Sequence, residues 1–186
     1  MTIAYVMGPS GAGKDTLLAL ARRALEGSRI LFTHRFITRD AAAGHENFIA
    51  LSSAEFALRA RLNLFALTWD AHGLRYGVSR EIELWQAAGC TIVVSGSRAH
   101  FLETLTQRQD VTPILITAPP DILAERLRRR GRENVAAMAE RLARARAFAI
   151  EHPRLVRIVN DTLPEAGATQ LVEALKAANA KPGGAT

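Results

Sequence analysis

The feature that most constrains this chain is a glycine-rich segment directly behind an apolar run, Gly8-Pro9-Ser10-Gly11-Ala12-Gly13-Lys14-Asp15-Thr16 after Ile3 to Met7. Glycines in such a loop let backbone N–H groups turn toward phosphate oxygens, and the lysine adds a cation beside the transferable phosphates. The helical periodicity that follows points the positive end of a helix dipole at the same anion. We therefore predict a strand, a phosphate-binding loop and a helix, with Gly8 to Thr16 binding ATP.

One position departs from the usual GxxxxGK[ST] pattern of such loops. Asp15 stands where a Ser or Thr hydroxyl normally contacts Mg²⁺. Thr16 follows one position later and is a poor replacement for that hydroxyl. Our hypothesis is that Asp15 contributes to the metal shell, directly or through water.

Length and composition indicate one α/β domain of an ordinary globular kind. The chain has 186 residues, of which 48% are hydrophobic and 23% charged, and it has no run near the roughly 20 apolar residues of a membrane span. The N-terminus runs at once into the first strand without a basic leader, so we expect a cytoplasmic protein that binds no membrane. Cys90 is the single cysteine, which excludes an intrachain disulfide and a cysteine metal cluster.

The basic residues favour a phosphorylated partner. The formal net charge is +6, and only three of the 24 basic residues are lysines. Arginine is the forked phosphate-binding side chain, which suits nucleic acid or small substrates that carry several phosphates. The arginine cluster at 126–132 contains no aromatic side chain to stack on bases, so we expect small-molecule substrates and no nucleic acid.

The order of apolar runs and helical segments predicts a parallel sheet flanked by helices. We expect a single domain over residues 1–180, an inserted acceptor-binding lobe at 33–78 with one helix near Ser53 to Arg61, and a flexible tail at 181–186. The sequence leaves the oligomeric state open. The expected strands are Ile3–Met7, Ile30–Phe32, Thr91–Val94, Pro113–Thr117 and Leu155–Val159, and the other expected helices are Lys14–Leu25, Ser79–Ala88, Ala99–Arg108, Asp121–Arg130, Val135–Glu151 and Pro164–Ala178.

An arginine-rich lid is predicted at residues 126–145. Five arginines fall within residues 126–132, around the helix-breaking Gly131, and Arg141 follows on the next predicted helix. In a phosphotransferase such a lid brings guanidinium groups over the phosphates and excludes water. We therefore predict that Lys14, Arg130 and Arg141 stabilise the transferring group. A solvated basic face remains the alternative, above all for Arg128 and Arg129.

The predicted acceptor site gathers polar residues from the insert and from the carboxyl end of a core strand, where ligands of open parallel sheets bind. Each of these residues has an ordinary structural role as its alternative. The predicted acceptor-binding residues are Arg35, Arg39, Tyr76, Arg80, Ser95, Ser97 and Arg98.

These motifs resemble the guanylate kinase fold group across almost the whole chain. The resemblance lies in GPSGAGKD, the Thr38-Arg39 pair, Tyr76-Gly77, the lid and Asn160-Asp161, and it adds Arg126 and Asn160 to the predicted nucleotide site. Guanylate kinases read guanine with a glutamate and an aspartate, and local alignment puts Leu67 and Ser97 there. A second aspartate near the metal becomes Ser95, and a phosphate-binding tyrosine becomes Phe48. Such a site should not recognise the base.

With these replacements, the sequence resembles the ribose 1,5-bisphosphate phosphokinases of phosphonate degradation. The resemblance lies in the segments HRFITR, GHENF, LNLFAL, YGV and SGSRAH. That resemblance implies ATP- and Mg²⁺-dependent phosphorylation of ribose 1,5-bisphosphate to 5-phosphoribosyl 1-diphosphate. A GMP kinase is the nearest alternative, which Leu67 and Ser97 disfavour. A catalytically dead protein-binding module and an RNA-binding ATPase are further alternatives; ATP turnover excludes the first, and the second requires salt-sensitive RNA affinity.

Overall fold

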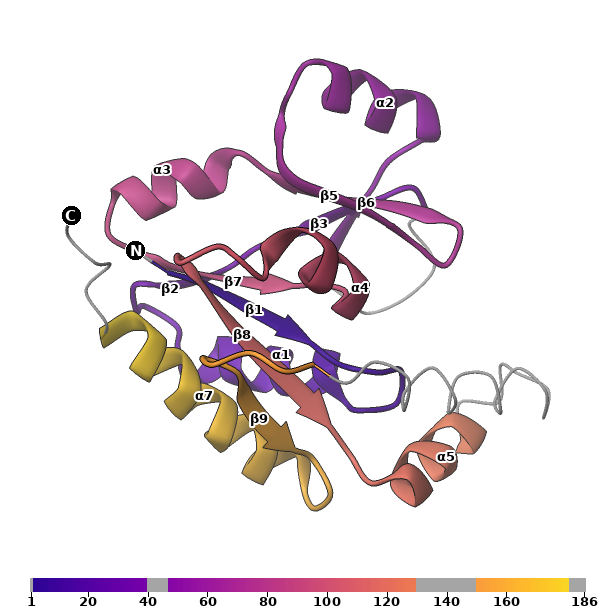
Figure 1. The fold of residues 1–186 in the computed structure, drawn as a ribbon, viewed down its shortest axis with the longest axis vertical. Helices are drawn as coiled ribbons and strands as arrows, with labels where there is room; N and C mark the ends of the chain where they lie inside the picture. The colour runs from indigo at the N-terminus through magenta and orange to yellow at the C-terminus, as the bar shows by residue number, and fades with distance from the viewer. Residues whose placement is uncertain (1, 40–46, 130–149, 181–186) are drawn as a thin grey trace.

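A five-stranded parallel sheet forms the centre of the protein, as the sequence predicts (Figure 1). The computed structural model describes residues 2–39, 47–129 and 150–180. All pairings in this sheet are parallel, and the strand order is β2-β7-β1-β8-β9. The strands are β1 (Ile3–Met7), β2 (Ile30–Phe32), β7 (Thr91–Ser95), β8 (Val111–Thr117) and β9 (Val156–Val159).

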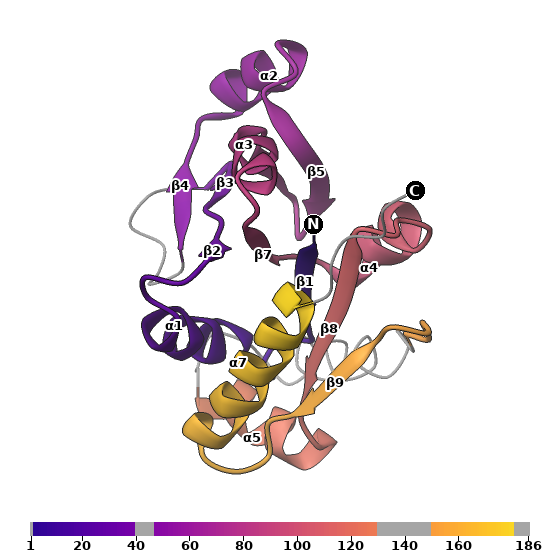
Figure 2. The same ribbon diagram turned by 90° about the vertical axis from the view of Figure 1, so that its left-hand side faces the viewer.

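Helices cover both faces of this sheet (Figure 2). Helices α1 (Lys14–Ala24) and α7 (Pro164–Ala180) pack on one face. The other face carries α3 (Glu81–Ala87), α4 (Arg98–His100) and the π-helical turn η1 (Phe101–Leu105). Helix α5 (Pro120–Arg129) follows β8 beyond the carboxyl ends of the strands (Figure 1).

Alternation along β1 explains the two hydrophobic cores. Ala4 and Val6 belong to the cluster under α1 and α7, whereas Ile3, Tyr5 and Met7 belong to the cluster on the opposite face. All five residues are at most 1% exposed. A central parallel strand is covered on both faces, so its sequence is continuously apolar, and the phosphate loop starts from the most buried strand.

A second sheet between β2 and α3 forms the lobe, which we define as residues 35–79 without the undescribed segment 40–46. Its strand order is β4-β3-β6-β5, with one parallel and two antiparallel pairings. The helix expected near residues 53–61 is confirmed, and the hydroxyl of Ser52 caps it by accepting from Glu55 N at 3.1 Å. The elements are β3 (Arg35–Ile37), β4 (Phe48–Ala50), α2 (Ser53–Arg61), β5 (Phe65–Ala71) and β6 (Leu74–Ser79).

The lobe is joined to the main sheet by shared packing. Its own small core consists of Leu51, Phe56 and Phe65. On its other face, Leu67, Trp69 and Val78 belong to the cluster that also contains Tyr5 and its neighbours on the main sheet. The lobe therefore has a defined position over the end of the main sheet.

One expected helix differs from the structure, and three expected segments lie largely or wholly outside the described residues. The helix expected at Ala99–Arg108 is instead a short α-helix followed by a π turn. The hydroxyl of Thr104 donates to the His100 carbonyl at 2.6 Å and so competes for an acceptor that a regular helix would use. Most of the expected helix Val135–Glu151, the lid beyond Arg129 and the tail at 181–186 lie outside the described residues.

Candidate functional site

The phosphate loop is held in a shape that only glycine permits at two positions. A Cβ atom on Gly8 would lie 2.3 Å from the carbonyl oxygen of Ile116 in β8. Gly13 has φ +83°, and a Cβ atom there would lie 2.4 Å from Nδ2 of Asn160. Either contact is closer than atoms tolerate, and φ near +80° disfavours any side chain. Glycine at these two positions therefore lets β8 and Asn160 pack directly against the loop backbone.

Asn160 and Arg126 bracket this loop from the other side. Asn160, which follows β9, is 3% exposed, and its Nδ2 donates to the carbonyl of Ala12 at 2.8 Å. Because a carbonyl can only accept, this contact fixes the orientation of the amide. Arg126 in α5 donates from Nη1 to the carbonyl of Asn160 at 2.9 Å. The structure thus brings both predicted nucleotide-binding residues against the phosphate loop.

Lys14 is the junction between the phosphate loop and β7. Its Nζ donates to Oδ1 of Asp15 at 2.9 Å and to the hydroxyl of Ser95 at 2.7 Å. Ser95 ends β7, so the lysine spans two neighbouring strands at their carboxyl ends. The Lys14 side chain is 13% exposed, whereas that of Asp15 is 41% exposed. The ammonium group is thus oriented by its neighbours, and the Asp15 carboxylate is the more exposed of the two charged groups.

Arg35 approaches the same carboxylate from the lobe. Its Nη2 lies 3.9 Å from Oδ1 of Asp15, and its guanidinium carbon lies 6.0 Å from the ring centre of Tyr76. Although Arg35 is charged, it is only 9% exposed. Burying a guanidinium is costly unless other groups compensate its charge, so this arginine is placed for electrostatic interaction rather than for solubility.

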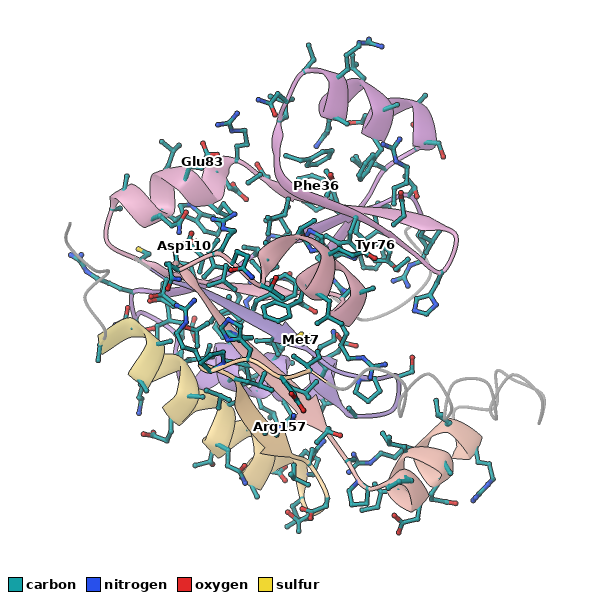
Figure 3. The ribbon with its side chains drawn as sticks, in the orientation of Figure 1. Met7, Phe36, Tyr76, Glu83, Asp110 and Arg157 are labelled. Carbon is teal, nitrogen blue, oxygen red and sulfur yellow. The ribbon has the colours of Figure 1, made fainter. Side chains whose placement is uncertain are left out.

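Arg39 follows β3 by two residues, and Tyr76 lies on the neighbouring strand β6 of the lobe. The guanidinium carbon of Arg39 lies 4.4 Å from the ring centre of Phe48. Phe48 is the residue that stands where the resemblance to guanylate kinases leads us to expect a tyrosine. Tyr76 in β6 faces the main sheet, above the carboxyl end of β1 where Met7 lies (Figure 3). The neighbouring Arg75 instead covers Phe56, on the lobe's other face.

Ser97 and Arg98 form a turn after β7 that rests on Tyr5. The backbone N–H of Ser97 donates to the Tyr5 hydroxyl at 3.0 Å, and a Cβ atom on Gly96 would lie 2.0 Å from Cζ of Tyr5. Arg98 opens α4 and is half-buried, and this burial lowers the pKa of its guanidinium. The turn is therefore placed by a residue of β1.

Three aromatic residues that are not among the predicted site residues complete this region, namely Tyr5, Trp69 and His100. The ring of Trp69 stacks on Tyr76 at 5.3 Å and on His100 at 5.1 Å between centres. The Tyr5 hydroxyl lies 2.8 Å from Nδ1 of His100. Tyr5 offered one signal, since it is the single polar side chain in an otherwise aliphatic strand, but its partners are distant in sequence.

Other predicted residues stand apart from this cluster or outside the description. The Nε of Arg80 donates to Glu83 at 2.9 Å, and Glu83 lies on α3, away from Tyr76 (Figure 3). Thr16 is exposed on the first turn of α1. Arg130 and Arg141 lie outside the described residues, so the structure does not place them.

A cavity of about 760 Å³ opens beside the cluster of Lys14 contacts. Asp15, Arg35 and Ser95 line it, together with Thr33, Asn47 and other residues of α1, β2 and β7. A volume of this size accommodates a phosphorylated metabolite. Within the described residues, no three acidic, histidine or cysteine side chains gather as a metal site, and no helix has the length and apolar character to span a bilayer.

Comparison with known proteins shows the family of this chain. Residues 5–147 match the family model described as an AAA domain. The chain is 45% identical to ribose 1,5-bisphosphate phosphokinase PhnN of Thiobacillus denitrificans, over 95% of this chain and 93% of that protein. It is 49% identical to the protein of the same name from Desulfomicrobium baculatum, over 84% of each chain. This chain belongs to the ribose 1,5-bisphosphate phosphokinase family. The phosphate loop of this kinase family member is therefore a nucleotide-binding element.

Solved structures support the fold of the kinase. A guanylate kinase from Anaplasma phagocytophilum superimposes with a TM-score of 0.66 and 22% identity, covering 97% of this chain and 87% of that one. A sugar kinase from Janibacter sp. HTCC2649 gives a TM-score of 0.51 at 18% identity, covering 97% of each chain. The guanylate-kinase-like P-loop fold predicted from the sequence is confirmed.

Proposed function

We propose that this kinase transfers the γ-phosphoryl group of ATP to the anomeric phosphate of ribose 1,5-bisphosphate. An oxygen of the 1-phosphate forms a bond to the γ-phosphorus while the bond from that phosphorus to the β–γ bridging oxygen breaks. ADP leaves with that oxygen, and the product is 5-phosphoribosyl 1-diphosphate. Family membership at 45% identity over nearly the whole chain supports this substrate.

The observation that carries the proposal is the burial of Leu67 among apolar side chains. At the position where the guanylate kinase resemblance expects a base-reading glutamate, Leu67 is 6% exposed inside an apolar cluster. Ser97 replaces the second carboxylate, and its backbone is bound to Tyr5. A site that lacks both carboxylates loses the hydrogen bonds that select guanine, because such discrimination depends on paired polar groups. The site therefore lacks the groups that would select guanine, which favours an acceptor other than GMP.

The chemistry demands alignment and charge neutralisation more than proton transfer. A phosphate oxygen is already nucleophilic at neutral pH, so no general base is required. In this proposal Lys14 stabilises charge on the transferring group, and Arg35 attracts the acceptor phosphate to the Asp15 side of the loop. Arg130 and Arg141 of the lid add positive charge over the phosphates and exclude water.

The nucleotide would lie along the loop from Gly8 to Thr16, with Arg126 and Asn160 behind it. A glycine-rich loop before the N-terminus of α1 suits a polyphosphate. Gly13 lets Asn160 pack directly against this loop, because a Cβ atom on Gly13 would lie 2.4 Å from Nδ2 of Asn160. Mg²⁺ supplies charge neutralisation between the phosphates when bound, and the exposed carboxylate of Asp15 is the group in this cluster with the right chemistry to contact it. The remaining acceptor residues of the proposal are Arg39, Tyr76, Arg80, Ser95, Ser97 and Arg98.

The test is a comparison of acceptors with purified protein, ATP and Mg²⁺. ADP release is followed with ribose 1,5-bisphosphate and with each nucleoside monophosphate in turn, and phosphorus NMR identifies the product. We expect turnover with the sugar bisphosphate and a diphosphate at the anomeric carbon. Efficient turnover of GMP with none of the sugar bisphosphate would overturn the proposal in favour of a nucleotide kinase.

A further inference from the structure

The ring of Tyr5 packs against the turn that follows β7. The residue is 0% exposed, and Gly96 lies so close to its ring that a Cβ atom there would contact Cζ at 2.0 Å and Oη at 2.1 Å. Phenylalanine would fill the same volume, so packing alone does not require a hydroxyl in this strand. The presence of a buried hydroxyl calls for a role in hydrogen bonding, because an unpaired one is costly.

The Tyr5 hydroxyl makes two polar contacts with Ser97 of the turn and one with His100 at the end of α4. It accepts from the Ser97 N–H at 3.0 Å, and its own hydrogen faces Nδ1 of His100 at 2.8 Å and the Ser97 carbonyl at 3.3 Å. Burial lowers the pKa of His100, which favours the neutral ring whose Nδ1 can accept. Burial also raises the pKa of Tyr5 far above its usual value, so the hydroxyl keeps its proton.

From His100 the contacts continue into the lobe. His100 stacks on Trp69 with an interplanar angle of 18°, and Trp69 stacks on Tyr76 with an angle of 6°. The guanidinium of Arg35 lies 6.0 Å from the Tyr76 ring centre and faces Asp15 of the phosphate loop at 3.9 Å. We name the three stacked rings of His100, Trp69 and Tyr76 the ring stack. Aromatic pairs of this geometry add stability beyond their buried area.

We propose that Tyr5 is a positioning residue of the acceptor site, which sets the Ser97–Arg98 turn through its hydroxyl and sets the lobe through His100 and the ring stack. The inference rests on the proposed function, because it assumes that Ser97, Arg98, Tyr76 and Arg35 surround the acceptor. Tyr5 itself contacts neither substrate. Small displacements of positioned groups cost large factors in phosphoryl transfer, which relies on alignment.

The first test removes only the hydroxyl. Tyr5→Phe should raise the KM for ribose 1,5-bisphosphate about tenfold, the effect of losing a buried hydrogen bond, while the KM for ATP changes less than about twofold. Thr91→Val is the matched control. Like Tyr5→Phe, this substitution deletes one buried hydroxyl, which donates to Oδ1 of Asn179 at 2.9 Å. Thr91 is the first residue of β7, whereas the Ser97–Arg98 turn follows the other end of that strand. Thr91→Val should lower stability without altering the KM for the acceptor.

The second test addresses the ring stack. Trp69→Leu should raise the acceptor KM as Tyr5→Phe does, and Trp69→Phe should restore it to within about threefold of the wild type because an aromatic ring can still stack. In the double variant Tyr5→Phe with Trp69→Leu, the increase should be smaller than the product of the two single increases, since both act through His100.

The outcomes separate this inference from the proposed function. If Tyr5→Phe, like Thr91→Val, lowers the unfolding midpoint but leaves the acceptor KM unchanged, Tyr5 is merely structural and the inference is wrong. If the wild type phosphorylates GMP instead of the sugar, the proposed function fails. The same comparison made with GMP then still decides whether Tyr5 positions the acceptor.

Discussion

The Nζ atom of Lys14 donates a hydrogen bond of 2.7 Å to the hydroxyl of Ser95, which ties the phosphate loop to the carboxyl end of the neighbouring strand β7. Together with the bond to Asp15, this contact holds the ammonium group at one place before substrates arrive. A cation that is oriented in advance pays little reorganisation at the moment of reaction.

Lys14→Ala should therefore abolish most of the turnover. We expect kcat/KM to fall by about 10²-fold or more, or roughly 3 kcal/mol of transition-state stabilisation, as is typical when a key charge contact is removed. Steady-state ADP release measures the loss. Lys176→Ala, on the exposed face of α7 where Lys176 pairs with Glu173, is the control and should retain wild-type activity. Equal activity of the two variants would contradict the assignment of Lys14.

Asp15→Ser tests the metal hypothesis, because it restores the residue type that the loop pattern normally has. If the carboxylate supports Mg²⁺, the magnesium concentration for half-maximal rate should rise about tenfold or more. Glu55→Ser removes a carboxylate from the first turn of another helix, α2 in the lobe, and should leave the magnesium dependence unchanged. An unchanged dependence in Asp15→Ser would remove Asp15 from the metal shell.

Gly13→Ala should damage both stability and nucleotide binding. The alanine would adopt φ near +83° and collide with Asn160 Nδ2, so we expect the free energy of unfolding to fall by about 2–4 kcal/mol and the KM for ATP to rise. Gly73→Ala is the matched control, since Gly73 has φ +72° with no atom within 4 Å of a Cβ, and it should cost only about 1 kcal/mol. Urea denaturation measures the free energy of unfolding of both variants, and steady-state kinetics measures the KM for ATP. Equal losses of unfolding free energy in the two variants would contradict the predicted collision with Asn160.

The pH dependence of stability should contain a contribution from His100. Burial lowers the pKa of this histidine in the folded state below its usual 6.5. Between the two pKa values the unfolded chain binds more protons, so the free energy of unfolding falls as pH drops below 6.5, and above 6.5 His100 contributes no slope. His100→Gln should lack this part of the slope in urea denaturation measured on both sides of 6.5. A stability difference between variant and wild type that does not change with pH would contradict the prediction.

Elements with local signals were predicted well. The strands Ile3–Met7 and Ile30–Phe32 have the bounds expected from the sequence, because short apolar runs mark them directly. The helix Ser53–Arg61 also lies where it was expected. The helix expected at Ala99–Arg108 was wrong in type, since periodicity does not reveal that the Thr104 side chain competes for a backbone carbonyl. Most of the predicted lid lies outside the described residues.

The sequence alone determined the chemistry of the phosphate loop, since glycines, lysine and the flanking apolar pattern lie within one short stretch and act through the backbone. Tertiary structure decided which distant groups join that loop: Ser95 reaches Lys14 across 81 positions, and Asn160 reaches Ala12 across 148. It also decided that Tyr5, His100 and Trp69 connect the main sheet to the lobe. The physical reason is that such contacts depend on strand order and packing between layers, which hydrophobic periodicity does not encode.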